Sequence, residues 1–342
     1  MPLDIEQPEQ LIDYLRSTGR IAANETPQTQ VLAGGVSNRT VLVERASGEA
    51  WVMKQALAKL RTKIDWYSDP ARIHREALGL KYLEQLAPPG SITPLIFEDQ
   101  QNYILAMRAV PRPHENWKTM LLAGRVETTH VEQFATILSR IHGASERRGD
   151  ELKSAFGDQA FFRSLRIEPF YQYTAGRIVE SKAFYADLIE ESLARRVSLV
   201  HGDFSPKNVL VRAGTLVLLD HEVIHWGDPA FDVGFAAAHL LSKAHHLPGH
   251  RAAFSDAAST FWRTYGKSLG AVSWNDAHAK LASRHALGCL LARVAGRSPL
   301  EYLSEQERER QHAVVVDLMR SPPADLQATI DEFIRGISHA GD

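Results

Sequence analysis

The sequence predicts an α+β protein with two lobes, in which a five-stranded antiparallel sheet precedes a larger and mostly helical part. Five short segments in roughly the first hundred residues have the composition and length of strands. Beyond them, apolar residues recur mostly at helical spacing. The chain has 342 residues, of which 44% are hydrophobic, so it is long enough to bury a large core and to form two lobes.

The predicted N-terminal elements are one helix and five strands. Residues 8–17 have the apolar spacing of a short amphipathic helix, and Ser47-Gly48 suits a hairpin turn. The predicted strands are Gln28 to Ala33, Arg39 to Ala46, Glu49 to Gln55, Ile92 to Glu98, and Asn102 to Met107.

A glycine-containing segment joins the first two predicted strands. It includes Gly34, Gly35 and Ser37. Because glycine lets backbone amides approach a phosphate closely, these three residues are candidate nucleotide-binding residues. An ordinary hairpin turn accounts for the segment equally well, and the residues alone leave both interpretations open.

Lys54 and Glu76 form a candidate ion pair. Lys54 lies on the third predicted strand, where a kinase places the lysine that contacts the phosphates of ATP. Glu76 falls near the start of a helix predicted over Arg75 to Leu83, where a kinase places the partner of that lysine. Taken singly, a strand lysine and a helix glutamate are more often solvent-exposed residues.

Two prolines, Pro111 and Pro113, follow the last predicted strand and limit the continuation of regular structure. A hinge is therefore predicted near residues 107–110, between an N-terminal lobe of residues 1–109 and a C-terminal lobe of residues 110–342. A strongly periodic helix is predicted over residues 131–142, with an apolar face that packs under the following loops.

The most informative segment of the chain runs from His201-Gly202-Asp203 to Asn208. The step of five residues from Asp203 to Asn208 equals the Asp-to-Asn step of the kinase catalytic loop. An isolated His-Gly-Asp is a common turn, because glycine permits unusual backbone angles. The residues after Asn208 decide between the two interpretations.

Two strand-like segments, Val209 to Val211 and Leu216 to Leu219, predict a hairpin that returns Asp220 beside Asn208. Phosphoryl transfer from ATP needs a carboxylate to hold the attacking hydroxyl and oxygen ligands to hold Mg²⁺. Asp203 is the candidate catalytic carboxylate, and Asn208 and Asp220 are the candidate metal ligands. The segment therefore predicts a kinase with ATP and Mg²⁺ as cofactors.

The short interval after Asp220 narrows the substrate class. Asp232 follows Asp220 by only twelve positions, whereas a protein kinase places its activation segment in that interval. No segment for docking a peptide fits there, which favours a small-molecule acceptor. Glu222 is either a second metal ligand, a substrate contact or a plain loop carboxylate.

These motifs resemble the aminoglycoside phosphotransferase and choline kinase superfamily, whose members have a protein-kinase-like fold and phosphorylate small molecules. The matching motifs are His-Gly-Asp-x4-Asn, Asp-x-Glu and Gly-Asp-Pro-x2-Asp, which ends at Asp232. The resemblance implies that Asp203 is the catalytic base, that Asp232 and His201 brace the catalytic loop, and that main-chain atoms of Met107 and Ala109 contact the adenine.

The balance of charge separates the members of this superfamily. Between Val233 and Leu300 the chain has two acidic residues and eight Lys or Arg residues. A kinase for polycationic aminoglycosides should instead present carboxylates to its substrate, because like charges in a partly desolvated cleft repel. This segment therefore favours a different acceptor.

A second resemblance, to methylthioribose kinases, rests on Val52-Met53-Lys54, on the Asp-x-Glu form of Asp220 and Glu222, and on Phe231-Asp232-Val233. It implies a sugar-like acceptor held by arginines of the C-terminal lobe, for which Arg284 and Arg293 are the candidates. An antibiotic kinase acting on aminoglycosides or macrolides is the alternative, and a nucleotide-binding protein without transfer activity is a second.

Composition excludes several other classes. The net charge of −2 gives no general attraction for nucleic acids or membranes. The chain has no signal-peptide pattern and no apolar run of about 18 residues, so a cytoplasmic location is expected. The single cysteine, Cys289, excludes an internal disulfide and lies in an apolar stretch that indicates burial. The oligomeric state stays open.

Overall fold

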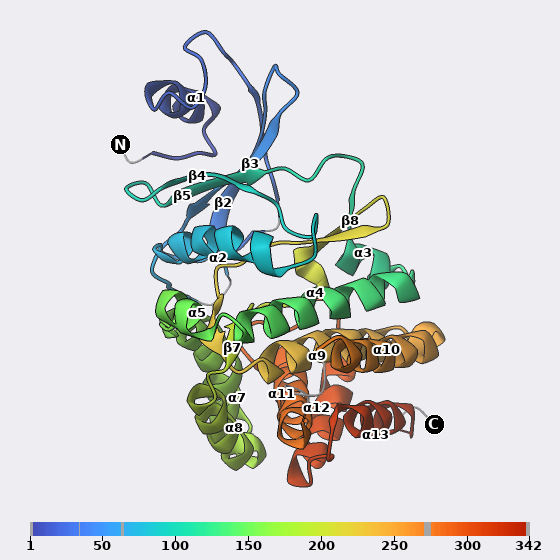
Figure 1. The fold of residues 1–342 in the computed structure, drawn as a ribbon. Coiled ribbons are helices and arrows are strands. Elements are labelled where there is room, and N and C mark those ends of the chain that lie inside the picture. The colour runs from blue at the N-terminus through green and yellow to red at the C-terminus, as the bar shows by residue number, and fades with distance from the viewer. Residues whose placement is uncertain (1–2, 34, 63–64, 270–274, 340–342) are drawn as a thin grey trace.

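The N-terminal sheet is antiparallel and has the strand order β1-β2-β3-β5-β4. The computed structural model describes residues 3–33, 35–62, 65–269 and 275–339. The strands of the sheet are β1 (Gln28–Val31), β2 (Asn38–Glu44), β3 (Ala50–Ala56), β4 (Leu95–Asp99) and β5 (Ile104–Arg108). Figure 1 shows this sheet above the helical lobe. The predicted five-stranded sheet is confirmed.

Two helices cover opposite faces of the sheet (Figure 1). Met53 of β3 packs with Leu11 of α1 (Pro8–Ser17) in one apolar cluster. Leu105 of β5 packs with Leu80 of α2 (Arg72–Leu86) in a second, larger cluster. Side chains alternate between the two faces of a strand, so residues next to each other in the sequence of a strand pack into different clusters.

One strand begins later than the sequence predicts. β4 starts at Leu95, not at Ile92, because Pro94 has no backbone N–H to donate to a ladder. Ile92 forms an isolated parallel bridge with Leu218 instead, and the N–H of Leu218 donates to the carbonyl oxygen of Ser91 at 2.8 Å. This bridge joins the N-terminal lobe to the hairpin that follows the catalytic motif.

The helical lobe holds most of the core. Its main helices are α3 (Trp117–Leu122), α4 (Thr128–Glu146), α5 (Gly149–Phe156), α7 (Tyr173–Arg177), α8 (Lys182–Ala194), α9 (Ala230–His246), α10 (Arg251–Leu269), α11 (Asp276–Ala295), α12 (Glu305–Arg320) and α13 (Leu326–His339). Shorter helical segments are α6 (Ala160–Phe162), η1 (Arg163–Gln172), η2 (Val179–Ser181), η3 (Pro206–Asn208) and η4 (Pro248–His250). The helix predicted over residues 131–142 lies within α4.

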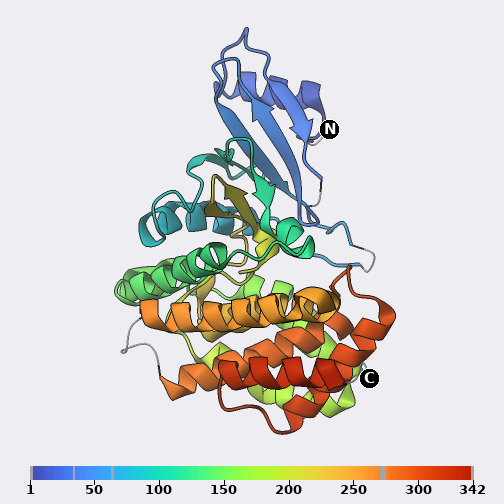
Figure 2. The ribbon, with the colours of Figure 1, turned by 90° about the vertical axis from the view of Figure 1, so that its right-hand side faces the viewer.

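α9 lies at the centre of this lobe, and every residue from Ala230 to His245 is buried. Figure 2 shows the helices of the lobe stacked below the sheet in roughly parallel layers. The residues after 300 contain two helices in the described part of the chain, α12 and α13. Ser304 caps α12 reciprocally with Glu307, which fixes the start of that helix.

Short strands carry the functional loops. They are β6 (Glu115–Asn116), β7 (Ser198–Val200), β8 (Val209–Arg212), β9 (Thr215–Leu218) and β10 (His225–Gly227). β8 and β9 form the predicted hairpin, and β7 pairs with β10. With the sheet above and the helices below, the arrangement is a protein-kinase-like two-lobe fold, as predicted. The division after residue 109 stays a prediction.

None of the described helices has the length and apolar character needed to cross a membrane.

Candidate active site

The hairpin of β8 and β9 brings Asn208 and Asp220 together. Val209 lies opposite Leu218, and the N–H of Leu219 donates to the carbonyl oxygen of Asn208 at 2.8 Å. Asp220 follows with a φ of 67°, a left-handed conformation that few residues other than glycine adopt. Such strained backbone is concentrated at functional sites, where the surrounding structure enforces it.

Asp232 holds the loop that carries Asp203. Its carboxylate accepts hydrogen bonds from the backbone N–H of His201 at 2.7 Å and of Gly202 at 2.8 Å. Gly202 has a φ of 78°, and a Cβ at this position would lie 2.7 Å from Cγ1 of Val223. His201 accepts a hydrogen bond from the N–H of Asp203 through Nδ1 at 3.1 Å. Through these contacts Asp232 and His201 fix the backbone of the loop that carries Asp203.

Two neighbours hold the carboxylate of Asp203. The Nδ2 of Asn208 donates to its Oδ2 at 2.7 Å, and Nη2 of Arg166 lies 3.0 Å from its Oδ1. Burial raises the pKa of Asp203, but the charges of Arg166 and Lys207 outweigh burial and hold the pKa below its usual value. The carboxylate is therefore ionised at neutral pH and points its two oxygens at fixed donors.

Lys54 bridges two carboxylates. Its Nζ lies 2.7 Å from Oε1 of Glu76 and 2.9 Å from Oδ1 of Asp220, which joins α2 and the loop after β9 to β3. Burial lowers the pKa of Lys54, but Asp220 and Glu76 outweigh it and raise the pKa, so the ammonium stays charged. Burial raises the pKa of Asp220, but the charges of Lys54 and Lys207 outweigh burial and lower the pKa below its usual value.

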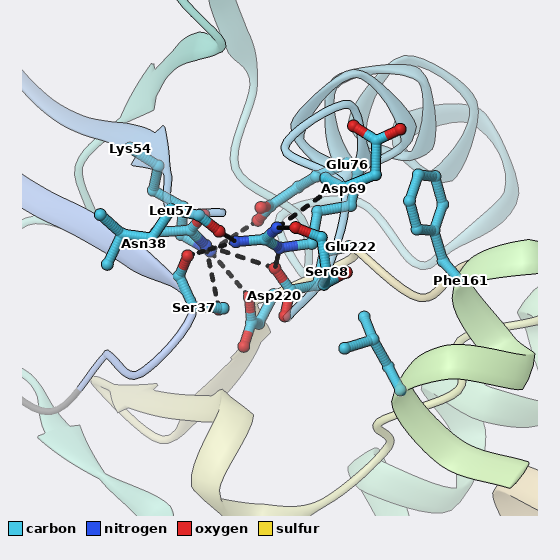
Figure 3. A network of polar contacts seen from close by, with 12 residues as sticks. Ser37, Asn38, Lys54, Leu57, Ser68, Asp69, Glu76, Phe161, Asp220 and Glu222 are labelled. Atoms are coloured by element: carbon cyan, nitrogen blue, oxygen red, sulfur yellow. Dashed lines mark hydrogen bonds and ion pairs between the residues drawn. The ribbon is translucent and has the colours of Figure 1, made fainter. Parts of the chain in front are cut away.

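Glu222 is bound by Arg72, an arginine that belongs to none of the sequence motifs. Nε of Arg72 lies 3.1 Å from Oε2 of Glu222, and the same guanidinium donates to the carbonyl oxygens of Ser37 and Leu57. Arg72 therefore joins the glycine-containing segment to the Asp-x-Glu motif. Figure 3 shows Glu76, Asp220 and Glu222 gathered close to Lys54 and Ser37.

The three carboxylates form a candidate cation site. One oxygen from each of Glu76, Asp220 and Glu222 lies within 4.8 Å of the others. Burial raises the pKa of Glu222, and the neighbouring charge of Asp220 raises it further. Burial also raises the pKa of Glu76, to about 7, against the opposing effect of Lys54. One oxygen of Glu76, Oε2, is buried without a hydrogen-bond partner in the described part of the chain.

A cleft of about 1260 Å³ between the lobes collects most of the predicted site residues. The predicted residues that line it are Gly35, Ser37, Lys54, Met107, Ala109, Asp203, Asn208, Asp220, Glu222 and Arg293. Glu76 and His201 lie behind this surface and contact Lys54 and Asp203, which line it, and Asp232 lies one step further back, bonded to His201. Gly34 lies outside the described residues.

The structure corrects one prediction and narrows another. Arg284 does not line the cleft in the described structure, because it pairs with Glu191 of α8 and lies over the ring of Phe184 at 5.4 Å. It is therefore not a substrate candidate. The N–H of Ala109 donates to the carbonyl oxygen of Ala50 at 2.9 Å, so only the carbonyl of Ala109 remains for an adenine contact.

Comparison with known proteins places these motifs in a family. The model of a family described as "Phosphotransferase enzyme family" matches residues 28–268, which include β1 to β10 and most of α10. The chain belongs to the phosphotransferase enzyme family. Membership confirms the predicted family and shows that the protein is a small-molecule kinase, with an alcohol group as acceptor.

Among the relatives of this phosphotransferase are methylthioribose kinases. The enzyme of Pectobacterium atrosepticum is 31% identical over 306 residues, which are 78% of this chain and 75% of the relative. That of Pectobacterium carotovorum is 24% identical over 332 residues, 85% of this chain and 81% of the relative.

Solved structures share the fold at low sequence identity. An amicoumacin kinase, solved in complex with AMP-PNP, Ca²⁺ and amicoumacin, is 13% identical with a TM-score of 0.55 and covers 87% of this chain and 90% of its own. A macrolide 2′-phosphotransferase from Brachybacterium faecium is 16% identical with a TM-score of 0.51, over 92% and 99% of the two chains. These likenesses support the kinase-like fold alone.

Sequence reasoning missed Arg166, Arg72 and Lys207 in this phosphotransferase. Nε of Arg166, from η1, also donates to the carbonyl oxygen of Gly202 at 2.6 Å, although 36 residues separate the two. Nothing in the local sequence of η1 marks that arginine. Lys207 stands inside the catalytic motif, between Asp203 and Asn208, and its position there was a usable signal.

Proposed function

We propose that this kinase transfers the γ-phosphate of ATP, with Mg²⁺, to a hydroxyl group of a small, sugar-like molecule. The observation that supports it most is the arrangement around Asp203. An ionised carboxylate, fixed by Arg166 and Asn208, faces the same cleft as Lys54 and Asp220. Phosphoryl transfer depends mainly on such positioning and on neutralising charge.

We propose Asn208 and Asp220 as the ligands of Mg²⁺, with Glu222 as a further candidate. The Nδ2 of Asn208 is engaged by Asp203, which leaves its amide oxygen for a cation. Asp220 is ionised, and hard oxygen donors of this kind suit Mg²⁺. When bound, the cation neutralises charge on the phosphates of the nucleotide. The AMP-PNP and Ca²⁺ in the amicoumacin kinase complex agree with a nucleotide and a divalent cation.

The nucleotide is proposed to lie between the lobes. Gly34, Gly35 and Ser37 would cover its phosphates, Lys54 would contact them, and Glu76 would hold Lys54 in place. The adenine would meet main-chain atoms near Met107 and the carbonyl of Ala109. This proposal assigns residues 1–109 to a nucleotide-binding lobe and residues 110–342 to a catalytic lobe, with the hinge near 107–110.

Asp203 is proposed to orient the acceptor hydroxyl and to take its proton late in the reaction. A carboxylate with a lowered pKa is a weak base, so early removal of the proton is unfavourable. In a loose transition state the nucleophile needs little activation, and a late transfer suffices. Asp232 and His201 would keep the loop of Asp203 in its working position through the hydrogen bonds described above.

The acceptor is proposed to be sugar-like because relatives over most of the chain are named methylthioribose kinases. Arg293 is the remaining candidate for an acceptor contact. An antibiotic kinase is the alternative, but Arg166, Lys207 and Arg293 line the cleft and would repel a polycationic aminoglycoside. Nucleotide binding without transfer is the second alternative, which the intact surroundings of Asp203 disfavour.

Purified protein should be incubated with ATP, Mg²⁺ and a panel of hydroxylated metabolites, with methylthioribose among the first, and products identified by mass. The expected result is a mass increase of one phosphoryl group on one acceptor class, which needs both ATP and Mg²⁺ and is lost in Asp203→Asn. Parallel tests with aminoglycosides and macrolides examine the alternative. ATP consumption that persists unchanged in folded Asp203→Asn would contradict the proposal.

A further inference from the structure

The end of the cleft formed by α9 and α11 contains basic side chains, most of them without an acidic partner among the described residues. We define the cation cluster as Arg293, Lys243 and Lys118 together with His239, whose pKa is held well below its usual value by burial and by the charge of Arg293. Arg293, His239 and Lys118 line the cleft, and Lys243 lies one turn beyond His239 on α9. Of the four, Lys118 pairs with a carboxylate, that of Glu301.

Arg293 is held by neutral groups. Its Nη1 donates to the carbonyl oxygen of Ser298 at 2.9 Å, and its Nη2 lies 3.2 Å from Nε2 of His239. The guanidinium lies over the rings of Phe170 at 4.7 Å and Phe235 at 5.2 Å. Its Nε is buried and has no hydrogen-bond partner among the described residues. An arginine fixed in this way is oriented but not neutralised.

Lys243 is fully buried, with 0% of its surface exposed. Its Nζ donates to the carbonyl oxygen of His239 at 3.1 Å, and within the described ranges no carboxylate forms an ion pair with it. Burial, and to a smaller extent the charge of Lys118, lower the pKa of Lys243 to about 7. Burying an ammonium without a counter-ion destabilises a fold, so this position needs an explanation.

The cluster belongs to the same cleft as the reacting carboxylate. The positive charge of Arg293 helps to lower the pKa of Asp203, and both residues line the cleft. Arg166 and Lys207 lie closer to the chemistry, because Arg166 pairs with Asp203 and Lys207 belongs to the catalytic motif. The proposed transfer step involves Lys54, Mg²⁺ and the residues around Asp203, and it assigns no role to Lys243 or Lys118.

We propose that the cation cluster binds an anionic group, a carboxylate or a phosphate, on the acceptor molecule. Arg293 contacts the group directly, and Lys243 and Lys118 supply positive charge beside it. This inference rests on the proposed function and narrows it, since the acceptor is then a sugar-like molecule with a negative charge at a distance from the reacting hydroxyl. Methylthioribose, which carries no such group, becomes the neutral reference compound.

Matched acceptors test the charge directly. Ribose and ribose 5-phosphate form one pair, and sorbitol and gluconate form another. In each pair the second compound carries an anionic group that the first lacks, and methylthioribose is a third neutral acceptor. We expect kcat/KM with ATP and Mg²⁺ to favour the anionic member of a pair by about tenfold or more, as one charge-assisted hydrogen bond provides. A preference of the wild type for neutral acceptors would overturn the inference and leave the kinase function intact.

Variants separate the cluster from general effects of charge. Arg293→Met should raise the KM for the anionic acceptor about tenfold or more, with a smaller change in kcat, and Arg293→Lys should recover part of the loss. Lys243→Met should act in the same direction without unfolding the protein, because it removes a desolvated charge. Lys267→Met, at an exposed position on α10, is the matched control. An unchanged anionic preference in Arg293→Met contradicts the inference.

A binding measurement works without knowledge of the acceptor. The thermal midpoint should be measured with AMP-PNP and Mg²⁺ at saturation, with inorganic phosphate added at constant ionic strength. Phosphate should raise the midpoint of the wild type and of Lys267→Met, and not that of Arg293→Met. No rise in the wild type contradicts the inference.

The outcomes distinguish two sources of the anion. Phosphate binding together with equal turnover of neutral and anionic acceptors would mean that the cluster binds a free anion, and this would overturn the assignment to the acceptor. Failure of the proposed function has a different signature, namely no stabilisation by AMP-PNP with Mg²⁺ and no phosphoryl transfer to any compound.

Discussion

Arg166 and Asp203 form an ion pair in the cleft, with Nη2 of the arginine 3.0 Å from Oδ1 of the aspartate. The same guanidinium donates to the carbonyl oxygen of Gly202, so it holds the loop and the carboxylate together. Asp203 therefore owes part of its orientation, and the largest single contribution to its lowered pKa, to a residue from η1.

Replacing Arg166 with Met should lower kcat about 100-fold, because an acceptor hydroxyl misplaced by about 1 Å loses that much. Without the guanidinium the pKa of Asp203 rises, since Arg166 is the largest of the charges that lower it. The ionised form is the active one, so the acid limb of the pH profile of kcat should move to higher pH. Arg163→Met, at an exposed position in η1, should leave the profile unchanged.

Asp203→Asn and Asp220→Ala should each lower turnover by about 10²- to 10⁴-fold. The two losses differ in kind. Asp203→Asn should keep the affinity for ATP with Mg²⁺, whereas Asp220→Ala should weaken it. Calorimetric titration with AMP-PNP and Mg²⁺ separates the two effects, and circular dichroism checks the fold. Normal binding and turnover in Asp220→Ala would falsify its role as a metal ligand.

Lys54→Met should destabilise the protein by about 3–5 kcal/mol, because it leaves the buried carboxylate of Glu76 without its partner. The double variant Lys54→Met/Glu76→Gln should recover part of this loss, since it removes the stranded charge. Both variants should bind nucleotide weakly. Urea denaturation measures the free energy of unfolding, and a double variant less stable than Lys54→Met would rule out this explanation.

Gly202→Ala should destabilise the fold by about 2–4 kcal/mol, because the methyl group adds overpacking against Val223 to the strain of a left-handed backbone. Gly214→Ala is a matched control with a φ of 76° and no atom within 4 Å of the added Cβ. It should lose about 1 kcal/mol. Equal losses in the two variants would mean that contact with Val223 plays no part.

Stability should fall as the pH drops from about 6.5 to about 4. Burial lowers the pKa of His225 from 6.5 to about 4, so in this window the unfolded state binds a proton that the folded state does not. The stability contributed by neutral His225 is present above pH 6.5 and is lost by pH 4, up to about 3 kcal/mol. Urea denaturation at pH 7 and pH 4.5 measures it. His225→Gln should reduce the dependence on pH, whereas His250→Gln, at an exposed position, should not.

Much of the candidate site follows from short-range patterns. The spacing from Asp203 to Asn208 and the hairpin up to Asp220 fix neighbouring loops through a few backbone hydrogen bonds. Lys54 and Glu76 were predicted from their places on a strand and a helix, and they meet at 2.7 Å. The strand pattern also predicted the sheet, although Pro94 delays the start of β4.

The class of reaction site is determined by the sequence alone, because its residues stand at short spacings and the local backbone geometry brings them close together. Only the tertiary structure decided that Arg166 pairs with Asp203, that Arg72 binds Glu222, and that Arg293 rather than Arg284 lines the cleft. The partners in the first two of these pairs lie 37 and 150 residues apart in the chain. Such contacts depend on how helices pack against loops. The apolar period of a helix predicts which face of the helix is buried, but it does not predict which residue a side chain on that face contacts.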